Sequence, residues 1–179
     1  SNSNYHSLQF STGQRIRSGM TWNVAYTFSK ALGTASTDTT TVSPFFDPRA
    51  RNYGPLTFDR NHVCNFRYTM NVPQLGKRLH RPWLGAFTDG WQFAGITRAQ
   101  SGAPFTPTYN LISGVDITGT PNETARPNIV NPLAPPEERF GAPARGEIGD
   151  VGTNTMRGPG WMNWDISLYR DVRFGEGKI

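Results

Sequence analysis

The side chains that could do chemistry are few and widely spaced. Asp59, Arg60 and His62 stand together in the sequence, and an acid, a cation and an imidazole are groups from which general acid–base sites are built. In a strand, side chains alternate between the two faces, so Arg60 and His62 would share one face while Asp59 would lie on the other. This spacing favours a hydrogen-bond network between a loop and a strand over an acid–base site.

Metal and cofactor chemistry find equally little support. Cys64 is the single cysteine, so the chain can form neither an internal disulfide nor a cysteine metal cluster. A calcium loop needs carboxylates about two residues apart, and the aspartates are more scattered than that, at Asp38, Asp47, Asp59, Asp116 and Asp150. We therefore expect a protein that is not an enzyme, holds no metal and needs no cofactor.

The basic residues do not predict a nucleic-acid surface. The formal net charge is +5, and the basic residues come closest together at Arg49 and Arg51 and at 77–81. Neither cluster is interleaved with aromatic residues, as a platform for nucleic-acid bases would be. We expect no nucleic-acid partner.

Long alternating segments position the polar side chains. From Met20 to Ser29 an apolar residue occupies every second position, and His62 to Pro73 repeats the pattern. A period of two places alternate side chains on the two faces of a strand. These segments exceed the typical strand of about 5–6 residues and match the roughly 9–11 that cross a bilayer. We expect five such strands, at 5–14, 20–29, 62–73, 91–101 and 161–174.

The connections between these strands alternate in length. The stretches 33–61 and 103–160 are longer than the turns at 15–19, 74–90 and 175–178. Outer-membrane barrels have short periplasmic turns and long outer loops. The chain, residues 1–179, is therefore predicted to be all-β: part of an antiparallel up-and-down transmembrane β-barrel in the bacterial outer membrane, with about five long strands and two long outer loops. The smallest such barrels have about eight strands, so we expect further strands in the complete protein.

The alternation also predicts which side chains face the lumen. Arg98 decides the matter, because an arginine facing lipid at the midplane would cost about 2–4 kcal/mol. The residues predicted to face the lumen, and to contact a plug, one another or a substrate, are Asn23, Thr27, Asn65, Arg67, Arg98, Gln100, Asn163 and Asp165. Trp91 and Trp161 begin strands, where amphipathic rings suit a membrane interface.

Several short motifs follow one another along nearly the whole chain. They read Ala25-Tyr-Thr-Phe-Ser-Lys-Ala-Leu32, Phe58-Asp-Arg-Asn-His-Val63, Gly90-Trp-Gln-Phe-Ala-Gly95 with Gln100-Ser-Gly-Ala-Pro-Phe105, Arg126-Pro-Asn128 and Arg157-Gly-Pro-Gly-Trp-Met-Asn-Trp-Asp-Ile-Ser-Leu168. In this order they resemble the late barrel region of Oar-like TonB-dependent receptors, which carry an N-terminal carboxypeptidase-regulatory-like domain.

The resemblance implies a plugged barrel of about twenty-two strands, surrounded by outer-membrane lipid and driven by the TonB complex. Its partners would be its own plug domain, TonB and an unknown large substrate. Two alternatives remain: a short porin that closes by oligomerisation, and a soluble jelly-roll-like carbohydrate-binding module. In the soluble module, a core rather than lipid would receive Trp22, Tyr26, Phe66, Tyr68 and Trp164.

Overall fold

The structure is a computed structural model that describes residues 2–16, 19–36, 48–74, 78–110, 117–118 and 124–171. The chain divides into two compact units. The sheet unit comprises Leu8–Thr27, His62–Gln100 and Trp161–Ile179. The loop unit comprises Ser1–Ser7, Phe28–Asn61 and Ser101–Gly160.

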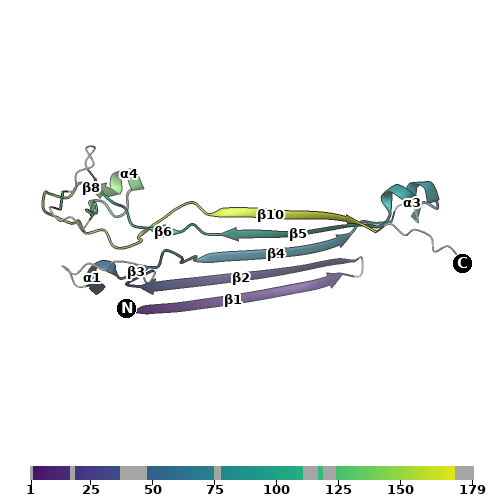
Figure 1. Cartoon of the computed structure of the whole chain (residues 1–179), viewed down its shortest axis with the longest axis horizontal. Coiled ribbons are helices and arrows are strands. Elements are labelled where there is room, and N and C mark those ends of the chain that lie inside the picture. The colour runs from purple at the N-terminus through teal and green to yellow at the C-terminus, as the bar shows by residue number, and fades with distance from the viewer. Residues whose placement is uncertain are drawn as a thin grey trace, which may run out of the picture. The chain divides into compact units, whose positions relative to one another are not determined.

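Five long strands form the main sheet. Their order is β1-β2-β4-β5-β10, and the short strand β3 (Gly54–Pro55) also pairs with β2. The arrows of β4, β5 and β10 alternate in direction from one strand to the next (Figure 1). The bounds of the long strands are Ser3–Ile16 for β1, Met20–Gly33 for β2, His62–Asn71 for β4, Trp91–Gln100 for β5 and Trp161–Arg170 for β10. This is the predicted antiparallel up-and-down arrangement.

The strand lengths agree with the sequence pattern, with differences at the ends. Four strands begin where predicted, and β1 begins two residues earlier, at Ser3. The hairpin between β1 and β2 closes on Gly19, whose N–H donates to the Ile16 carbonyl over 3.0 Å. Gly19 has a φ of 83°, a left-handed conformation that glycine adopts without steric cost. The last strand ends at Arg170, and the predicted turn at 175–178 lies outside the described residues.

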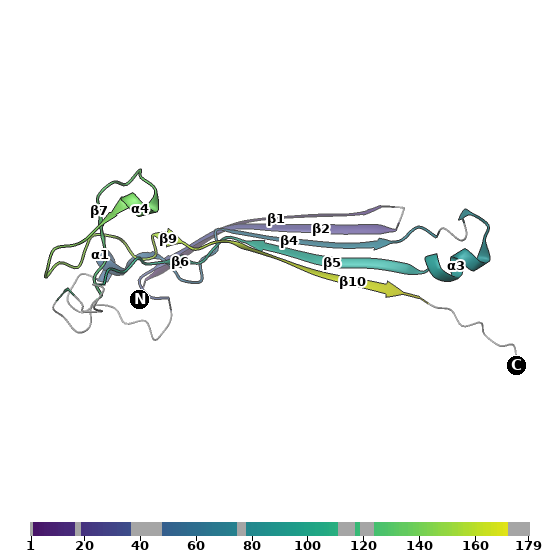
Figure 2. The same ribbon diagram turned by 90° about the horizontal axis from the view of Figure 1, so that it is seen from above.

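Pairing of β4, β5 and β10 places the apolar residues of each strand in rows on one face. Thr97 pairs with Phe66 on one side and Trp164 on the other. In the next row, Gly95 pairs with Tyr68 and Ile166. Figure 2 shows the three strands in succession. Directly opposed residues point to the same face of a sheet, so every second residue adds to a continuous apolar surface.

This apolar face is exposed on the two edge strands and half-buried over most of β4 and β5. Every residue of β1 and of β10 is exposed, and Trp164 keeps 57% of its surface accessible. A large exposed apolar surface normally marks an interaction site with a partner or a membrane. The exposed large side chains on these two strands include Leu8, Phe10, Met162, Ile166 and Leu168.

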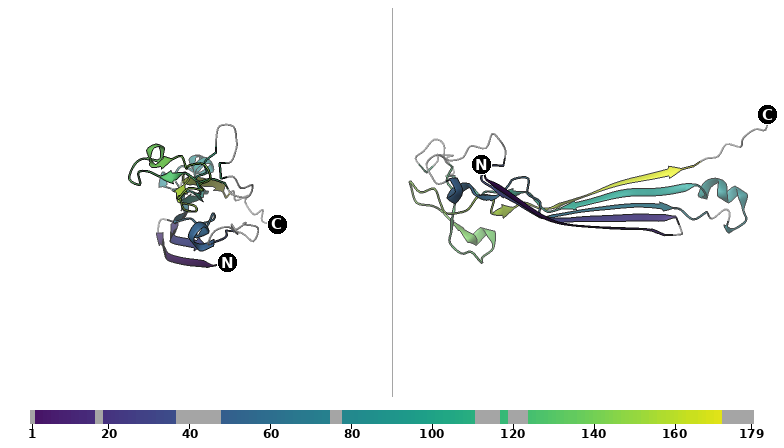
Figure 3. Two further views of the ribbon diagram at one scale, coloured as in Figure 1. Left: turned by 90° about the vertical axis from the view of Figure 1, so that its left-hand side faces the viewer. Right: turned by 90° about the horizontal axis from the view of Figure 1, so that it is seen from below.

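The connection between β4 and β5 contains a short helix that the sequence pattern did not predict. Helix α3 (Pro82–Thr88) begins with a proline in its first turn, where proline's fixed φ suits a helix. It ends at Asp89, whose N–H donates to the Gly85 carbonyl. The Trp91 indole N–H then donates to the Phe87 carbonyl over 2.8 Å. Figure 3 shows this helix (teal) adjoining β5.

The loop unit contains short elements and a small core. Strand β6 (Pro104–Phe105) pairs with β9 (Met156–Arg157), and β7 (Asn128–Ile129) pairs with β8 (Phe140–Gly141). Its helices are α1 (Pro48–Asn52) and α4 (Pro136–Arg139). The buried apolar residues are Ala31, Leu56, Ala125, Ala134 and Val151. The described residues of the segment 103–160, which was predicted to be irregular, therefore form very short elements.

Candidate functional site

The polar face of the sheet unit, opposite its apolar face, contains most of the predicted lumen-facing residues. Arg98 in β5 pairs with Asn65 in β4 and with Asn163 in β10. One row away, Ile96 pairs with Arg67 and Asp165, so these two charged residues flank an apolar side chain. Three strands thus contribute to one polar surface. We call it the polar face.

Asn23 and Thr27 join this face by parity. The Tyr26 hydroxyl lies 2.7 Å from His62 Nδ1, which places the even-numbered residues of β2 and β4 on the same side. Alternation then puts Asn23 and Thr27 on the other side, with Asn65 and Arg67. Gln100 pairs with Val63 and Trp161 and follows the same parity. All eight predicted residues therefore share one face, while their contact with a lumen or a substrate stays a prediction.

The two tryptophans predicted at the membrane interface lie on different faces. Trp91 shares the parity of Phe93, and the Arg170 guanidinium lies 5.4 Å from the centre of its ring, on the apolar face. Trp161 pairs with Gln100 and shares the parity of Asn163. Trp91 thus lies on the apolar face and Trp161 at the end of the polar face, and the position of both at a membrane interface stays a prediction.

In the loop unit, Asp59 is the centre of a buried polar cluster. Its Oδ1 accepts a hydrogen bond from the Ala31 N–H over 2.7 Å, and its Oδ2 forms an ion pair with Arg157. The guanidinium of Arg157 also donates to Asn61 Oδ1 over 2.8 Å and to the Gly102 carbonyl over 3.2 Å. One arginine therefore joins three segments of the chain.

The three residues that the sequence placed together do not converge on one site. Asp59 contacts Ala31 and Arg157. Arg60 Nη1 donates to the Thr57 and Asp59 carbonyls over 3.0 and 2.8 Å. His62 belongs to the sheet unit and contacts Tyr26 there. This is the arrangement of a structural network. The alternation assumed for these three residues does not apply, because Asp59 and Arg60 precede β4, which begins at His62.

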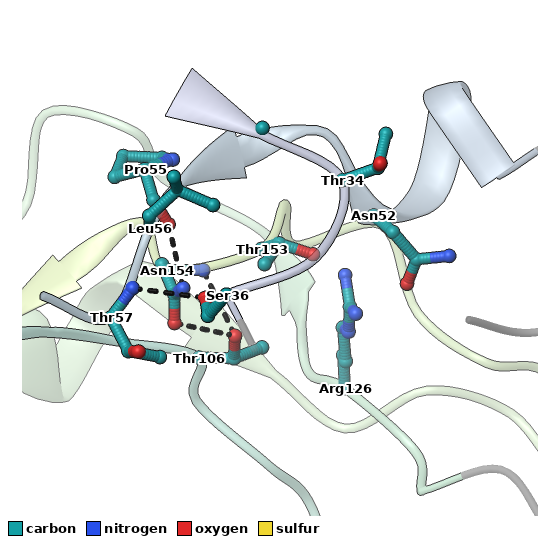
Figure 4. Close-up of a pocket in the computed structure, with 11 residues that line it drawn as sticks. Thr34, Ser36, Asn52, Pro55, Leu56, Thr57, Thr106, Arg126, Thr153 and Asn154 are labelled. Carbon is teal, nitrogen blue, oxygen red and sulfur yellow. Dashed lines mark hydrogen bonds between the residues drawn. The ribbon is translucent and has the colours of Figure 1, made fainter. Parts of the chain in front are cut away.

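A pocket of about 250 Å³ opens beside this cluster, entirely within the loop unit. Pro55 and Leu56 line it together with a majority of polar residues. Figure 4 shows two sets of hydrogen bonds, one between Ser36 and Thr57 and the other between Asn154 and both Pro55 and Thr106. The side chains of Asn52 and Arg126 lie apart from both sets. The polar side chains come from several segments and comprise Thr34, Ser36, Asn52, Thr57, Thr106, Arg126, Thr153 and Asn154.

Asn154 organises one wall of this pocket. Its Nδ2 donates to the Pro55 carbonyl over 2.6 Å, and its backbone N–H donates to Thr106 Oγ1 over 2.9 Å. The Thr106 hydroxyl in turn donates to Asn154 Oδ1 over 3.2 Å. Asn154 has a φ of 55°, in the left-handed region that asparagine tolerates better than most residues. These bonds join the segment before β9 to strand β3 and to the residue that follows β6.

Two further kinds of site are absent from the described residues. No group of three or more His, Cys, Asp or Glu side chains there could hold a metal ion. No helix in the part of the chain that the structure describes is both long and apolar enough to span a membrane.

A family model for an outer membrane beta barrel domain matches residues 1–179. The chain belongs to this family. The chain is therefore located in the bacterial outer membrane. Its long alternating strands are those of an outer-membrane β-barrel domain. No curated protein and no solved structure matches the chain.

Sequence reasoning missed the role of Arg157 and the whole of the pocket. Arg157 was noted only as the first residue of a motif, although it pairs with Asp59 of another motif. The two motifs contain residues of opposite charge, Asp59 and Arg157, in a chain that is poor in charge. This was a usable signal that the two residues form a pair. The pocket had none, because its residues are dispersed over positions 33–154.

Proposed function

We propose that this outer membrane beta barrel domain is part of a TonB-dependent receptor of the Oar-like type, a non-enzymatic importer of a large substrate. The proposal rests on a structural difference between the two units of the chain. The sheet unit has one apolar and one polar face, and the loop unit has its own buried residues and a polar pocket. A receptor needs both a lumen wall and built outer loops.

In this proposal the polar face lines the lumen and the apolar face meets lipid. Arg98, Asn65 and Asn163 form one row across three strands, and such a row would offer hydrogen bonds to a plug domain or to a passing substrate. The segments 33–61 and 103–160 would be the outer loops that capture substrate. Movement of the plug, driven by TonB from the inner membrane, would then open the path.

The soluble jelly-roll module is the weaker reading. It requires Phe66, Tyr68 and Trp164 to fill a core, whereas Trp164 keeps 57% of its surface exposed. Membership of an outer membrane beta barrel family also argues against it. A short porin is the stronger competitor, because it shares the barrel and differs in lacking a plug and energy coupling.

Mass and conductance of the native polypeptide distinguish these two functions. The protein would be purified from an outer-membrane fraction, weighed after denaturation and placed in a planar lipid bilayer. A plugged receptor should weigh several times the 19.9 kDa of this chain and show no steady open conductance. A mass near that value together with a steady ion current would identify a porin and overturn the proposal.

A further inference from the structure

Helix α3 of the sheet unit exposes two large aromatic side chains. Trp83 and Phe87 keep 62% and 73% of their surfaces accessible, and residues four positions apart lie on the same side of a helix. The backbone holds this helix in shape, since the Gly85 N–H donates to the Arg81 carbonyl over 3.2 Å. Large apolar side chains that are exposed together mark a surface that meets a partner or a membrane.

Basic residues precede this aromatic pair. Arg78 and Arg81 come shortly before α3 in the chain, and both are exposed. Lys77 lies outside the described residues and adds a further positive charge, whereas the acidic residue of the sequence from 72 to 90 is Asp89. The connection is therefore basic as a whole. Positive charge next to exposed aromatic rings is typical of segments that lie on an anionic membrane surface.

Hydrogen bonds hold α3 at the end of the apolar face. Trp91, whose side chain lies on this face, donates its indole N–H to the Phe87 carbonyl over 2.8 Å. The start of β5 is itself fixed by both neighbouring strands. The Val72 N–H donates to the Trp91 carbonyl over 2.9 Å, and the Asp171 N–H donates to the Gly90 carbonyl over 2.9 Å. Figure 2 shows α3 beyond the ends of β4 and β5. The exposed aromatic pair thus adjoins the surface that meets lipid in the proposed barrel.

The length of the strands sets the depth of α3 in the membrane. Strands β4 and β5 have ten residues each. At about 3.3 Å per residue and a tilt of about 40°, such a strand rises roughly 25 Å, which is the height of the apolar band of an outer-membrane barrel. Because α3 ends directly before β5, we expect the helix at the level of the lipid headgroups. The long connections leave the other ends of these strands, so this level is the periplasmic one in the predicted orientation.

We propose that α3 lies in the periplasmic leaflet of the outer membrane and binds anionic phospholipids there. Trp83 and Phe87 insert among the lipids, and Arg78 and Arg81 bind the phosphate groups, whose geometry the guanidinium matches. Each arginine or lysine near an anionic lipid surface strengthens binding roughly fivefold. The inference goes beyond the proposed function, because a porin with the same strands would present the same helix. The mass and conductance that test the receptor function therefore do not decide it.

Photocrosslinking in intact outer membranes identifies what covers α3. The full-length protein would carry p-benzoylphenylalanine in place of the exposed Phe87, and mass spectrometry would identify the adducts. The expected adduct is a phospholipid. The matched control carries the same photoreactive residue in place of Leu133, which is 97% exposed in the loop unit, and should give no phospholipid adduct. A lipopolysaccharide adduct at position 87 would place the helix in the other leaflet, and a protein adduct would identify a protein partner instead of lipid. Either of these, no adduct, or equal phospholipid labelling at both positions overturns the proposal.

Lipid selectivity tests the role of the two arginines. The full-length protein with the photoreactive residue at position 87 would be placed in vesicles of equal parts phosphatidylglycerol and phosphatidylethanolamine, which differ in net charge. The phosphatidylglycerol adduct should exceed the other at least fivefold. Arg78→Gln combined with Arg81→Gln should lower this ratio at least threefold while total lipid labelling persists, because the aromatic residues still insert. Arg145→Gln, which removes an exposed arginine of the loop unit, should leave the ratio unchanged. Equal adducts without substitution, or a ratio that the double variant does not lower, overturns the assignment of an anionic lipid.

Discussion

Asp59 and Arg157 form an ion pair between two segments of the loop unit that are 98 residues apart in the sequence. The Asp59 side chain is 1% exposed and that of Arg157 is 28% exposed. Because Asp59 also accepts from the Ala31 N–H, the pair joins the end of β2, the segment before β4 and strand β9. The ion pair thus holds together three chain segments that are remote in sequence.

Replacing Asp59 with asparagine should destabilise the contacts between these three segments. Asn keeps the size of Asp but presents an amide donor to either Ala31 N–H or Arg157, and it leaves the arginine without its counter-charge. Breaking a buried ion pair typically costs about 3–5 kcal/mol. We expect the Ala31 amide and the segment around Arg157 to exchange hydrogen at least tenfold faster in the full-length protein, as measured by mass spectrometry.

The matched control for that substitution is Glu137→Gln, which removes the same charge from an exposed residue of α4. Its exchange rates should equal those of the wild type. Equal rates in Asp59→Asn and in the control would show that the pair contributes little to the loop unit.

Gly149 should be intolerant of a side chain. It has a φ of 73°, and a Cβ at this position would collide with the backbone carbonyl of Arg126. Gly146 has a similar φ of 86°, but nothing lies within 4 Å of its Cβ position. Gly146→Ala should therefore cost only about 1 kcal/mol for the left-handed conformation, whereas Gly149→Ala should also displace the backbone near the pocket.

Limited proteolysis of the full-length protein compares these two glycine variants. Cleavage within 124–160 should accelerate strongly in Gly149→Ala and only slightly in Gly146→Ala. Similar cleavage rates in the two variants would contradict the contact between Gly149 and Arg126.

On the apolar face, Gly95 provides space for the ring of Tyr68. A Cβ at Gly95 would lie 2.5 Å from both Cζ and Oη of Tyr68, and the ring stacks on Phe93 with centroids 5.7 Å apart. Gly95→Ala should therefore displace the ring and destabilise the folded protein by about 1–3 kcal/mol. In a Tyr68→Ala background the same change should be neutral or stabilising, since alanine is better than glycine within a strand.

Urea unfolding of the full-length protein in lipid vesicles measures this double-mutant cycle. The expected sign is a negative coupling between the two positions, with the double variant less destabilised than the sum of the single ones. Additive effects would mean that the ring does not depend on Gly95.

How much the sequence could predict depended on the range of the interaction. Alternation is local, so the strands of Phe66 and Trp164, and the common face of Arg98 and Asn163, followed from parity alone. Helix α3 was missed because its seven residues are too few to show a helical period. Strand β10 ends at Arg170, before the predicted end near 174, because no local signal marks where pairing with β5 stops, and residues 172–174 lie outside the described residues.

Contacts between residues far apart in the sequence could not be predicted, for a different reason. The register of β10 on β5, which pairs Trp161 with Gln100, is set by pairing across a connection of sixty residues. Likewise, the pocket brings Ser36, Asn52 and Arg126 together only after the loop unit has folded. A single sequence carries no signal for which distant polar residues will meet.

The orientation of the sheet in the membrane is testable with two adjacent residues of β10. Ile166 pairs with Gly95 on the apolar face, and Ser167 pairs with Ala94 on the polar face. Both positions are exposed and lie near the middle of the strand. Ile166→Arg should destabilise the protein in lipid vesicles by about 2–4 kcal/mol, as a charge does at the midplane of a bilayer. Ser167→Arg should cost less than about 1 kcal/mol, because in the proposed barrel this position faces the lumen. Urea unfolding of the two variants of the full-length protein gives the comparison. Equal costs would mean that both faces meet the same environment, and a larger cost for Ser167→Arg would reverse the assignment of the faces.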